Sequence, residues 1–288
     1  TGSTQHNIRI REMAAKKGLK ISEYGVFRES SGRRVAGATE EEVYAAVGLP
    51  WIPPEIREDQ GEVEAALKGA LPKLVEVSDL RGDLHCHTNA SDGQHTIEAL
   101  VGEAQKRGYE YILISDHSKS ATVAGGLSAE ELTAHVKKIR AVQKKFTGIT
   151  VLAGSECDIL PDGSLDYPDE LLATLDLVLG AVHSRFKQPA AEMTARISKA
   201  LRNPYVQILA HPTGRLLGER DAYEVDLDQV FRTARECGKA VEINSHPLRL
   251  DLNDVHARRA REMQVPLAIS TDAHVLDQLE SIELGVAT

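Results

Sequence analysis

The segment Asp83–His87 reads Asp-Leu-His-Cys-His and places two imidazole side chains two residues apart. In an extended strand, residues two apart point to the same face, so His85 and His87 converge while Cys86 points away. Asp92 follows five residues after His87, in a glycine-containing turn from which its carboxylate can fold back over the strand end. A single His-x-His pair is weak evidence, because exposed edge strands also carry polar residues.

Further candidate ligands come at the points where predicted strands end. Barrels of parallel strands place their chemistry at that end, because side chains from different strands converge there. A buried histidine taken alone is more often a core residue than a ligand. Recurrence at the same end of several strands favours a metal site instead. The nine candidate ligands are His85, His87, Asp92, His117, Glu156, His183, His211, Asp272 and His274.

Imidazole and carboxylate ligands together suit zinc, manganese or iron, and the set contains no thiolate. Nine ligands exceed the need of one ion, so we expect two or three divalent metals, Mn2+ or Zn2+ or both, with Glu156 as a bridging carboxylate. Such a centre attracts phosphate, deprotonates a water at neutral pH and stabilises the pentacoordinate phosphorus that hydroxide attack creates. Phosphoester hydrolysis is therefore the expected chemistry, with Glu156, Asp272 and His211 as catalytic residues.

Three cations follow ligand-bearing strand ends and could hold phosphate oxygens, although ordinary loop charge is the more common role of such residues. They are Arg215, Arg185 and Lys119.

The remaining histidines fall away from strand ends. We assign four of them to the solvated surface, and they are His6, His95, His135 and His256. His246 stays open, because it lies just past the sixth predicted strand but is followed by Pro247.

From residue 80 onward, short apolar runs alternate with amphipathic helices, which predicts an α/β fold built from parallel βα units. Because nearly every run is continuously apolar, both faces of the strands should be covered, in a barrel or a doubly wound sheet. The seven predicted strands are Asp83–His87, Tyr109–Ser115, Thr150–Gly154, Leu175–Val182, Val206–Ala210, Ala240–Asn244 and Pro266–Ser270. The predicted helices are Thr96–Arg107, Ser128–Phe146 with a capping box of Ser128 and Glu131, Ala190–Leu201, Asp226–Cys237 and Asn253–Gln264.

Residues 1–78 have a different pattern and predict a small separate unit without catalytic spacing. Its first helix, Ile8–Lys17, stops at Gly18, a residue that suits a helix C-terminus. Thr39 and Glu42 predict a capping box. The other expected elements are strands Leu19–Ser22 and Tyr24–Phe27, a loop Arg28–Gly37, a helix Val43–Val47, a break over 51–54 and a helix Glu62–Ala70.

The 288-residue chain has a formal charge of -9 and 42% hydrophobic residues. This negative charge argues against a protein whose whole surface is basic and binds nucleic acid. Bound divalent cations can nevertheless make the electrostatic potential positive locally. The three cysteines are widely spaced, as in a protein with reduced thiols. No apolar run reaches the roughly 18 residues of a membrane span, and no signal pattern opens the chain. We therefore expect a cytoplasmic protein with no membrane partner.

The ligand-bearing motifs resemble those of the polymerase and histidinol phosphatase (PHP) family over residues 79–288. They are Asp-Leu-His-Cys-His with Asp92, Ser-Asp-His, Gly-Ser-Glu, Val-His-Ser, Ala-His-Pro-Thr-Gly-Arg-Leu-Leu-Gly and Ser-Thr-Asp-Ala-His. The resemblance implies a distorted seven-stranded (βα)7 barrel with a trinuclear metal centre. One metal would take His85, His87, Glu156 and Asp272; a second would take Glu156, His183 and His211; a third would take Asp92, His117 and His274. Several relatives carry histidine where this chain has Asp92, so the third site would be weaker or would prefer manganese.

The first 78 residues are similar to the C-terminal, thumb-like subdomain of family X DNA polymerases. The similarity rests on the run from Thr1-Gly2-Ser3 through Asn7 and Arg11, and on Gly18-Leu19-Lys20-Ile21-Ser22-Glu23-Tyr24. It implies a small α+β subdomain in which Asn7 faces the incoming nucleotide and Arg11 the template minor groove. Bacterial family X polymerases join this subdomain to a PHP domain in this order.

A polymerase palm with its aspartate triad would precede Thr1, so we expect no polymerase activity from this chain. The Asp-x-Asp of Asp226 and Asp228 opens a predicted helix and reads as an N-cap with a favourable dipole interaction.

These features together predict a metal-dependent nuclease for DNA ends. We expect chiefly 3′–5′ exonuclease activity, with abasic-site and 3′-phosphate processing, from a monomer acting on single-stranded or gapped DNA. The alternative is a small-molecule phosphatase of histidinol-phosphate type, which the barrel alone favours and the polymerase-like first unit disfavours. A third reading, a barrel that only supports a polymerase, disagrees with the intact ligand set.

Overall fold

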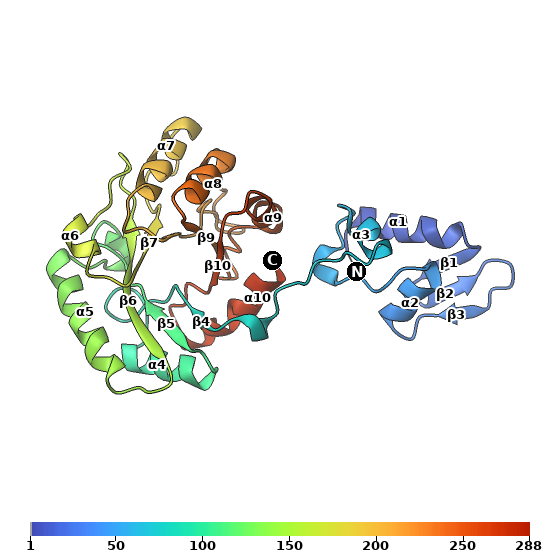
Figure 1. The fold of residues 1–288 in the computed structure, drawn as a ribbon, viewed down its shortest axis with the longest axis horizontal. Coiled ribbons are helices and arrows are strands. Elements are labelled where there is room, and N and C mark those ends of the chain that lie inside the picture. Colours follow the sequence, from blue (N-terminus) through green and yellow to red (C-terminus); the bar gives the residue numbers. More distant parts are fainter. Residues whose placement is uncertain (1) are drawn as a thin grey trace. The chain divides into compact units, whose positions relative to one another are not determined.

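The computed structural model describes residues 2–288 as two compact units that divide between Leu74 and Val75. The sequence places this boundary after residue 78. Thr1, the first residue of the motif Thr1-Gly2-Ser3, lies outside the described residues. Each unit has its own buried core, and each is labelled by element in Figure 1.

The first unit packs helices against a three-stranded antiparallel sheet. The predicted loop Arg28–Gly37 is partly wrong, because Arg34–Ala36 forms an edge strand on β2 that a run with two apolar residues did not reveal. The elements are α1 (Thr4–Ala15), β1 (Leu19–Ser22), β2 (Gly25–Arg28), β3 (Arg34–Ala36), α2 (Glu40–Val47), the 3-10 turn η1 (Pro54–Ile56) and α3 (Glu62–Leu67).

Two helices of this unit, α1 and α2, start earlier than predicted because polar residues cap them, whereas α3 starts at the predicted Glu62. Ser3 caps α1, and Thr39 caps α2 by accepting a hydrogen bond from the Glu42 N–H at 3.3 Å. The predicted capping box is wrong, because the Glu42 carboxylate accepts hydrogen bonds from the N–H groups of Gly37 and Ala38 instead.

His6 is buried in the core of the first unit, so the prediction of a surface position is wrong. Its Nδ1 lies 2.5 Å from Glu62 Oε1, and its Nε2 lies 2.8 Å from the Tyr44 hydroxyl. Both ring nitrogens have partners, which is what allows a polar ring to occupy a core. The partners come from distant parts of the sequence, so the local helix pattern could not indicate them.

The second unit contains seven parallel strands and the helices that connect them. The strands are β4 (Gly82–Asp83), β5 (Tyr111–Ile114), β6 (Thr150–Asp158), β7 (Leu177–Ala181), β8 (Ile208–Leu209), β9 (Ala240–Asn244) and β10 (Leu267–Ser270). The α-helices are α4 (Ile97–Lys106), α5 (Ala129–Gln143), α6 (Asp169–Leu172), α7 (Ala190–Leu201), α8 (Leu227–Glu236), α9 (Asp254–Glu262) and α10 (Ile282–Ala287). Short 3-10 turns are η2 (Val77–Asp79), η3 (Thr122–Ala124) and η4 (Leu276–Ser281).

The sheet runs in order from β4 to β10, and its two outer strands approach each other to give a nearly closed barrel. Beyond β4, Cys86 forms a parallel bridge with Ala273, which lies beyond β10. The His87 N–H donates to the Ala273 carbonyl at 2.8 Å, and the Ala273 N–H donates to the His85 carbonyl at 3.3 Å. The predicted α/β barrel is confirmed.

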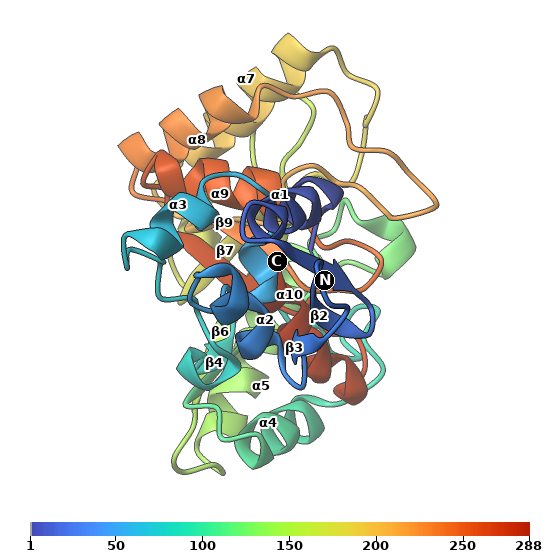
Figure 2. The same ribbon diagram turned by 90° about the vertical axis from the view of Figure 1, so that its right-hand side faces the viewer.

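Apolar side chains fill both sides of the strands. Leu113 belongs to a small cluster inside the barrel, whereas its neighbours Ile112 and Ile114 pack toward the helices, as strand alternation requires. Figure 1 shows α4, α5, α7 and α8 around the outside of the barrel, and α7 and α8 lie side by side in Figure 2 as well. The continuous apolar runs in the sequence thus reflect strands covered on both faces.

Of the seven predicted barrel strands, β9 has the predicted bounds, β6 is longer, and the other five are shorter than predicted. The ladder of β4 ends at Asp83, whose carboxylate accepts the N–H groups of His85 and Thr271, so the strand prediction through His87 is too long. β6 continues four residues past Gly154 because its polar second half pairs with β7. The α7 range and the capping box that starts α5 are confirmed.

No helix among residues 2–288 is long and apolar enough to cross a membrane. The three cysteines, Cys86, Cys157 and Cys237, are free thiols.

Candidate metal centre

The six candidate histidines lie together where the strands of the barrel end. Neighbouring ring centroids are 4.3 to 6.1 Å apart, and they link all six rings into one cluster. His85 and His87, from the chain beyond β4, are 5.1 Å apart between centroids. His211 and Asp272 have positive φ angles, 25° and 56°, which turn the chain sharply where it leaves β8 and β10.

Glu156 lies at the middle of this cluster and is fully buried. Its Oε1 is 2.6 Å from His211 Nε2 and 3.2 Å from His183 Nε2. Its Oε2 is 2.9 Å from His117 Nδ1 and 3.4 Å from His85 Nε2. A carboxylate that faces rings from four strand ends has the geometry expected of a bridging ligand.

Three overlapping groups have ligand atoms within 4.8 Å of one another. One group is the same as that implied by the resemblance, and two differ in one member each: His87 joins the group around Asp92, and His117 takes the place of His211 beside His183. The groups are His85, His87, Glu156 and Asp272; His87, Asp92, His117 and His274; and His117, Glu156 and His183.

The donor atoms fit a divalent cation. Buried polar atoms normally have a partner, and imidazole nitrogens and carboxylate oxygens are the usual ligands of zinc and manganese. Six such atoms at this cluster are buried and make no hydrogen bond of good geometry with residues 2–288. They are His85 Nε2, His87 Nδ1, His117 Nδ1, Glu156 Oε2, His183 Nε2 and His211 Nδ1.

The charges of the cluster shift its ionisation strongly. Burial opposes the charged form of Glu156, but the surrounding histidines, His183 foremost, hold its pKa well below the usual range. Burial also opposes the charged form of His117, yet the carboxylates of Glu156 and Asp92 raise its pKa to about 10. Burial, together with the neighbouring His117, lowers the pKa of His87 to about 4. The carboxylates are therefore ionised and are stabilised by positive charge in this pocket.

Glu242, which the sequence reasoning missed, orients two of the candidate ligands. This buried residue of β9 accepts hydrogen bonds from His85 Nδ1 at 2.7 Å and from the Ser270 hydroxyl at 2.6 Å. Its other oxygen accepts the backbone N–H of His211 at 2.6 Å. Because Nδ1 of His85 donates to Glu242, Nε2 is the nitrogen that faces Glu156 and Asp272 and would hold a cation between them. A glutamate inside the apolar run of β9 was the available signal.

Two buried aspartates lie next to the candidate ligands, and one of them, Asp158, orients a ligand as Glu242 does. Asp158 accepts a hydrogen bond from Nδ1 of His183. Asp116 is bonded to Nε2 of His135 at 2.8 Å. The prediction of a surface position for His135 is wrong, since 4% of it is exposed. Burial opposes ionisation of Asp116, but the bond from His135 brings its pKa below the ordinary value.

Arg249 is a cation of the centre that the sequence reasoning also missed. Its Nε lies 3.2 Å from Asp272 Oδ2, and its side chain is 17% exposed. Arg215, a predicted phosphate ligand, donates from Nε to the Arg249 carbonyl at 2.8 Å and from Nη2 to the Leu250 carbonyl. Arg215 thus supports the loop that presents Arg249.

The other predicted cations, Arg185 and Lys119, are exposed on the loops that follow β7 and β5. His246 is partly buried, and its Nε2 lies 3.3 Å from Gln278 Nε2. The Oε1 of Gln278 in turn accepts the N–H of His274 at 2.7 Å.

His95 and His256 are partly exposed. Asp226 caps α8 by accepting the Gln229 N–H at 2.9 Å, and Asp228 pairs with Arg259 at 2.8 Å, so the N-cap prediction for this Asp-x-Asp is confirmed.

Two family models match the chain. A DNA polymerase beta thumb model matches residues 1–58, and a PHP domain model matches residues 83–246. The chain belongs to the PHP family. The predicted order, a polymerase thumb followed by a PHP domain, is confirmed by these matches.

Curated relatives agree with this PHP assignment. A DNA polymerase/3′-5′ exonuclease PolX from Bacillus subtilis is 45% identical over 286 residues, which cover 99% of this chain and 50% of that protein. The chain therefore spans half the length of that relative. A probable phosphatase from Thermoanaerobacter sp. is 30% identical over 204 residues, which cover 67% of this chain and 78% of the relative.

Solved structures share the PHP barrel. A histidinol phosphate phosphatase from Lactococcus lactis, in complex with zinc, L-histidinol and phosphate, matches with a TM-score of 0.50 and 16% identity, and the match covers 72% of this chain and 92% of that one. A HisK histidinol phosphatase structure from Listeria monocytogenes matches with a TM-score of 0.53 and 14% identity, over 69% of this chain and 97% of the other. At this identity the match shows the fold alone.

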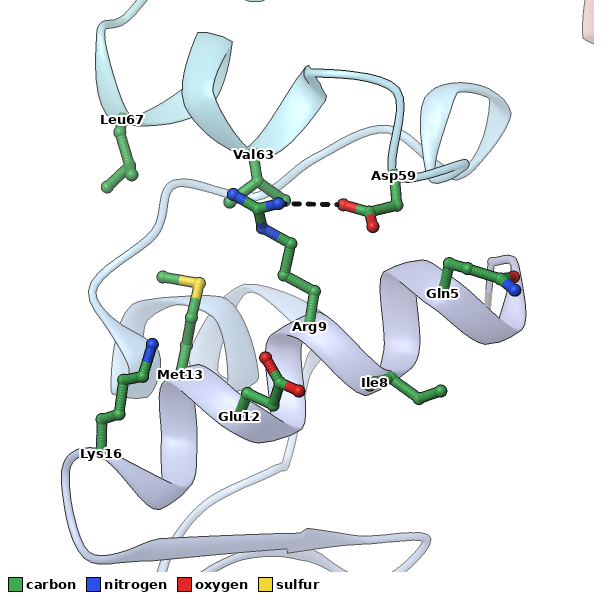
Figure 3. A pocket seen from close by; sticks show the side chains of 9 residues that line it. All are labelled: Gln5, Ile8, Arg9, Glu12, Met13, Lys16, Asp59, Val63 and Leu67. Carbon is green, nitrogen blue, oxygen red and sulfur yellow. Dashed lines mark hydrogen bonds and ion pairs between the residues drawn. The ribbon is translucent and has the colours of Figure 1, made fainter.

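The thumb-matched segment carries Asn7 and Arg11 on α1. The Asn7 side-chain amide donates to the carbonyls of Ser3 at 2.9 Å and Gly2 at 3.1 Å, and Arg11 is exposed. A groove of about 550 Å³ on another face of α1 is shown in Figure 3, where Arg9 pairs with Asp59 at 3.4 Å across it. Neither Asn7 nor Arg11 lines this groove.

Proposed function

We propose that the chain is a metal-dependent phosphodiesterase that acts on DNA ends, chiefly as a 3′–5′ exonuclease, with abasic-site and 3′-phosphate processing as further activities. The observation that carries the proposal is the buried Glu156 at the middle of six histidines, in a chain whose first 58 residues match a polymerase thumb. The name of the Bacillus subtilis relative, which includes 3′-5′ exonuclease, supports the same substrate class.

Nine side chains would hold two or three divalent cations, manganese or zinc or both. The six buried donor atoms without hydrogen bonds support this proposal. When bound, the cations would supply a nucleophilic water at neutral pH and would neutralise charge on the phosphate. The proposed ligands are His85, His87, Asp92, His117, Glu156, His183, His211, Asp272 and His274.

Three residues are proposed as catalytic. Glu156 would hold two cations together, since it faces ring nitrogens with both oxygens. His211 donates to Glu156 from Nε2 at 2.6 Å and would orient that carboxylate. Asp272, held by His87 at 3.0 Å and by Arg249, would complete the centre on the side of β10.

Arg249 is the proposed phosphate contact, in place of Arg215. Its guanidinium lies at the centre and is partly exposed, and a forked cation of this kind binds phosphate oxygens well. Arg185 and Lys119 would contact more distant phosphates from the exposed loops.

The units would divide the work. Residues 79–288 would carry the phosphoesterase chemistry, and residues 1–78 would contact DNA through Asn7 and Arg11. We propose 3′ ends of single-stranded or gapped DNA as the partner, bound by a monomer. The cytoplasmic location and the absence of polymerase activity stay predictions.

A second candidate function is a small-molecule phosphatase of histidinol-phosphate type. The relatives named as probable phosphatases and the fold of the two histidinol phosphatases favour it. The thumb match over residues 1–58 favours DNA instead, because a small ester needs no such unit.

One experiment separates these functions. The protein is stripped with a chelator, reloaded with manganese or magnesium, and given an end-labelled single-stranded oligonucleotide or histidinol phosphate. We expect the oligonucleotide to be shortened from its 3′ end, and manganese to restore more activity than magnesium because the site is rich in imidazole. Hydrolysis of histidinol phosphate with an intact oligonucleotide would establish the second function.

A further inference from the structure

His135 and Asp116 form a buried polar pair that the proposed chemistry does not use. His135 lies on α5 with 4% of its surface exposed, and Asp116 lies just beyond β5 and is fully buried. Their Nε2 and Oδ2 atoms are 2.8 Å apart. An ionised carboxylate can only accept, so His135 donates from Nε2. Burying such a pair is costly, and an apolar pair of similar volume would often be at least as stable.

The Asp116 carboxylate also holds the segment that leads to Asp92. Its Oδ1 accepts the Thr88 N–H at 2.9 Å and the Ser91 hydroxyl at 2.7 Å, and its Oδ2 accepts the Thr88 hydroxyl at 2.8 Å. With the bond from His135, each oxygen has two donors. The carboxylate cannot rotate without losing several of these bonds, so it fixes Thr88 and Ser91.

Asp92 depends on this support more than the other candidate ligands do. It comes from a turn rather than from a strand end, and its side chain is 32% exposed, compared with 28% for His274 and 8% for His117. Its oxygens lie 3.4 Å from His117 Nε2 and 3.3 Å from His274 Nε2. A small shift of the turn would carry the Asp92 carboxylate away from both rings.

We infer that His135 is a positioning residue for the Asp92 side of the metal centre: it holds Asp116, which holds Thr88 and Ser91, and so sets where Asp92 meets His117 and His274. The inference rests on the proposed metal centre.

The effect should be confined to one group of ligands. The opposite side of the centre is held by other carboxylates, because Glu242 bonds His85 and Asp83 accepts the His85 N–H. Loss of His135 leaves those contacts in place. The group of His85, His87, Glu156 and Asp272 shares only His87 with the group around Asp92. We therefore expect the cation at Asp92 to be weakened and the cation at His85, Glu156 and Asp272 to be retained.

The test counts manganese in the full chain. Wild type, His135→Leu, His135→Gln, Asp92→Ala and the double variant His135→Leu/Asp92→Ala are dialysed against manganese chloride, and bound metal per chain is measured over a concentration series. We expect His135→Leu to weaken one manganese by about 10- to 100-fold, the range found when residues that orient ligands are removed. Asp92→Ala should weaken the same ion, and the double variant should lose no more than Asp92→Ala alone. His135→Gln keeps an N–H donor and should recover most of the binding.

Two more variants test whether the loss of metal comes from a general destabilisation of the region around α5. Tyr167→Phe removes a buried hydrogen bond to the Leu127 carbonyl, 2.6 Å long, at the start of α5 and should keep the wild-type metal count. Ser91→Ala removes the 2.7 Å bond to Asp116 and a longer, 3.4 Å bond to Asp92 Oδ1 from the partly exposed side of the turn. It should weaken the same ion even if His135→Leu does not fold.

The inference is overturned if His135→Leu and Ser91→Ala keep wild-type affinity while Asp92→Ala loses an ion. It is also overturned if Tyr167→Phe loses as much as His135→Leu. A wild-type chain that binds no manganese would instead remove the proposed metal centre itself, and this inference with it.

Discussion

Glu156 contacts five histidines with its two oxygens, so its loss removes a common partner rather than one contact. We expect Glu156→Gln to lower phosphodiester hydrolysis by at least about 100-fold and to release bound metal, because an amide cannot bridge two cations. His95→Ala, at a partly exposed loop position, should stay within about two-fold of wild type. Steady-state rates and metal analysis of both variants check this, and equal losses would remove the bridging assignment.

For Arg249 we expect a change in substrate binding rather than in metal content, because this residue is proposed to bind the phosphate of the substrate. Arg249→Lys keeps the charge but loses the forked donor geometry, so we expect KM to rise about ten-fold, equivalent to about 1.4 kcal/mol, with a smaller change in kcat. Inhibition by inorganic phosphate should weaken in parallel. If the variant instead loses metal at unchanged KM, Arg249 acts by holding Asp272 and not by binding phosphate.

For single residues, the sequence predicts a role where both the residue type and its position in a strand or loop indicate that role. The nine candidate ligands were found because imidazoles and carboxylates recur where apolar runs end. Glu242, Asp116 and His135 were missed because their roles depend on contacts across the fold, such as the bond from His85 to Glu242, which joins residues 157 positions apart. His6 was missed for the same reason.

The elements were predictable where burial is continuous. α7 and β9 have the predicted bounds, since their apolar patterns begin and end cleanly. The predicted β6 ended too early. Its second half consists of polar residues such as Ser155 and Glu156, which pair with β7 and also line the centre. β3 was missed because an edge strand of three residues leaves almost no apolar pattern.

One element-scale prediction concerns the join between α2 and η1 in the first unit. Arg57, just after η1, donates two hydrogen bonds to the Glu40 carboxylate, each 2.8 Å long, and Trp51 donates a third at 3.2 Å. These bonds, that of Arg57 foremost, lower the pKa of Glu40 from 4.5 to about 2. A carboxylate with a lowered pKa stabilises the folded state above its unfolded pKa, and this contribution is lost as pH falls toward the folded value.

Glu40→Gln should therefore cost about 1 kcal/mol of unfolding free energy at pH 7, a modest figure because the Glu40 side chain is half exposed. The difference from wild type should shrink between pH 4.5 and pH 2. Urea unfolding followed by fluorescence checks this directly, since Trp51 is the single tryptophan of the chain. A difference that stays constant with pH would mean that packing, and not the ionised carboxylate, is responsible.

At the scale of the whole molecule, all nine candidate ligands lie in the second unit. Residues 75–288 alone should therefore hydrolyse a small phosphodiester at close to the rate of the full chain. On DNA we expect a modest rise in KM from the missing first unit, largest at low salt, because phosphate contacts weaken as salt increases.

Both substrates are measured for both lengths of chain across a salt series. A shortened protein that binds metal but leaves the small ester intact would show that the first unit completes the catalytic site.

The bridge between Cys86 and Ala273 closes the barrel at a place where closure and ligand capture use the same residues. His85 and His87 flank one side of that seam, and Asp272 and His274 flank the other. Cations bound between them would link the two ends of the sheet. Their removal should therefore make the barrel open locally at the Cys86–Ala273 bridge before it opens elsewhere. The backbone amide hydrogens of His87 and Ala273, which bond across this bridge, should exchange with deuterium faster in chelated protein. The amide of Leu179, on the middle strand β7, should stay protected. The exchange rate at this one bridge would therefore measure how much metal the barrel holds.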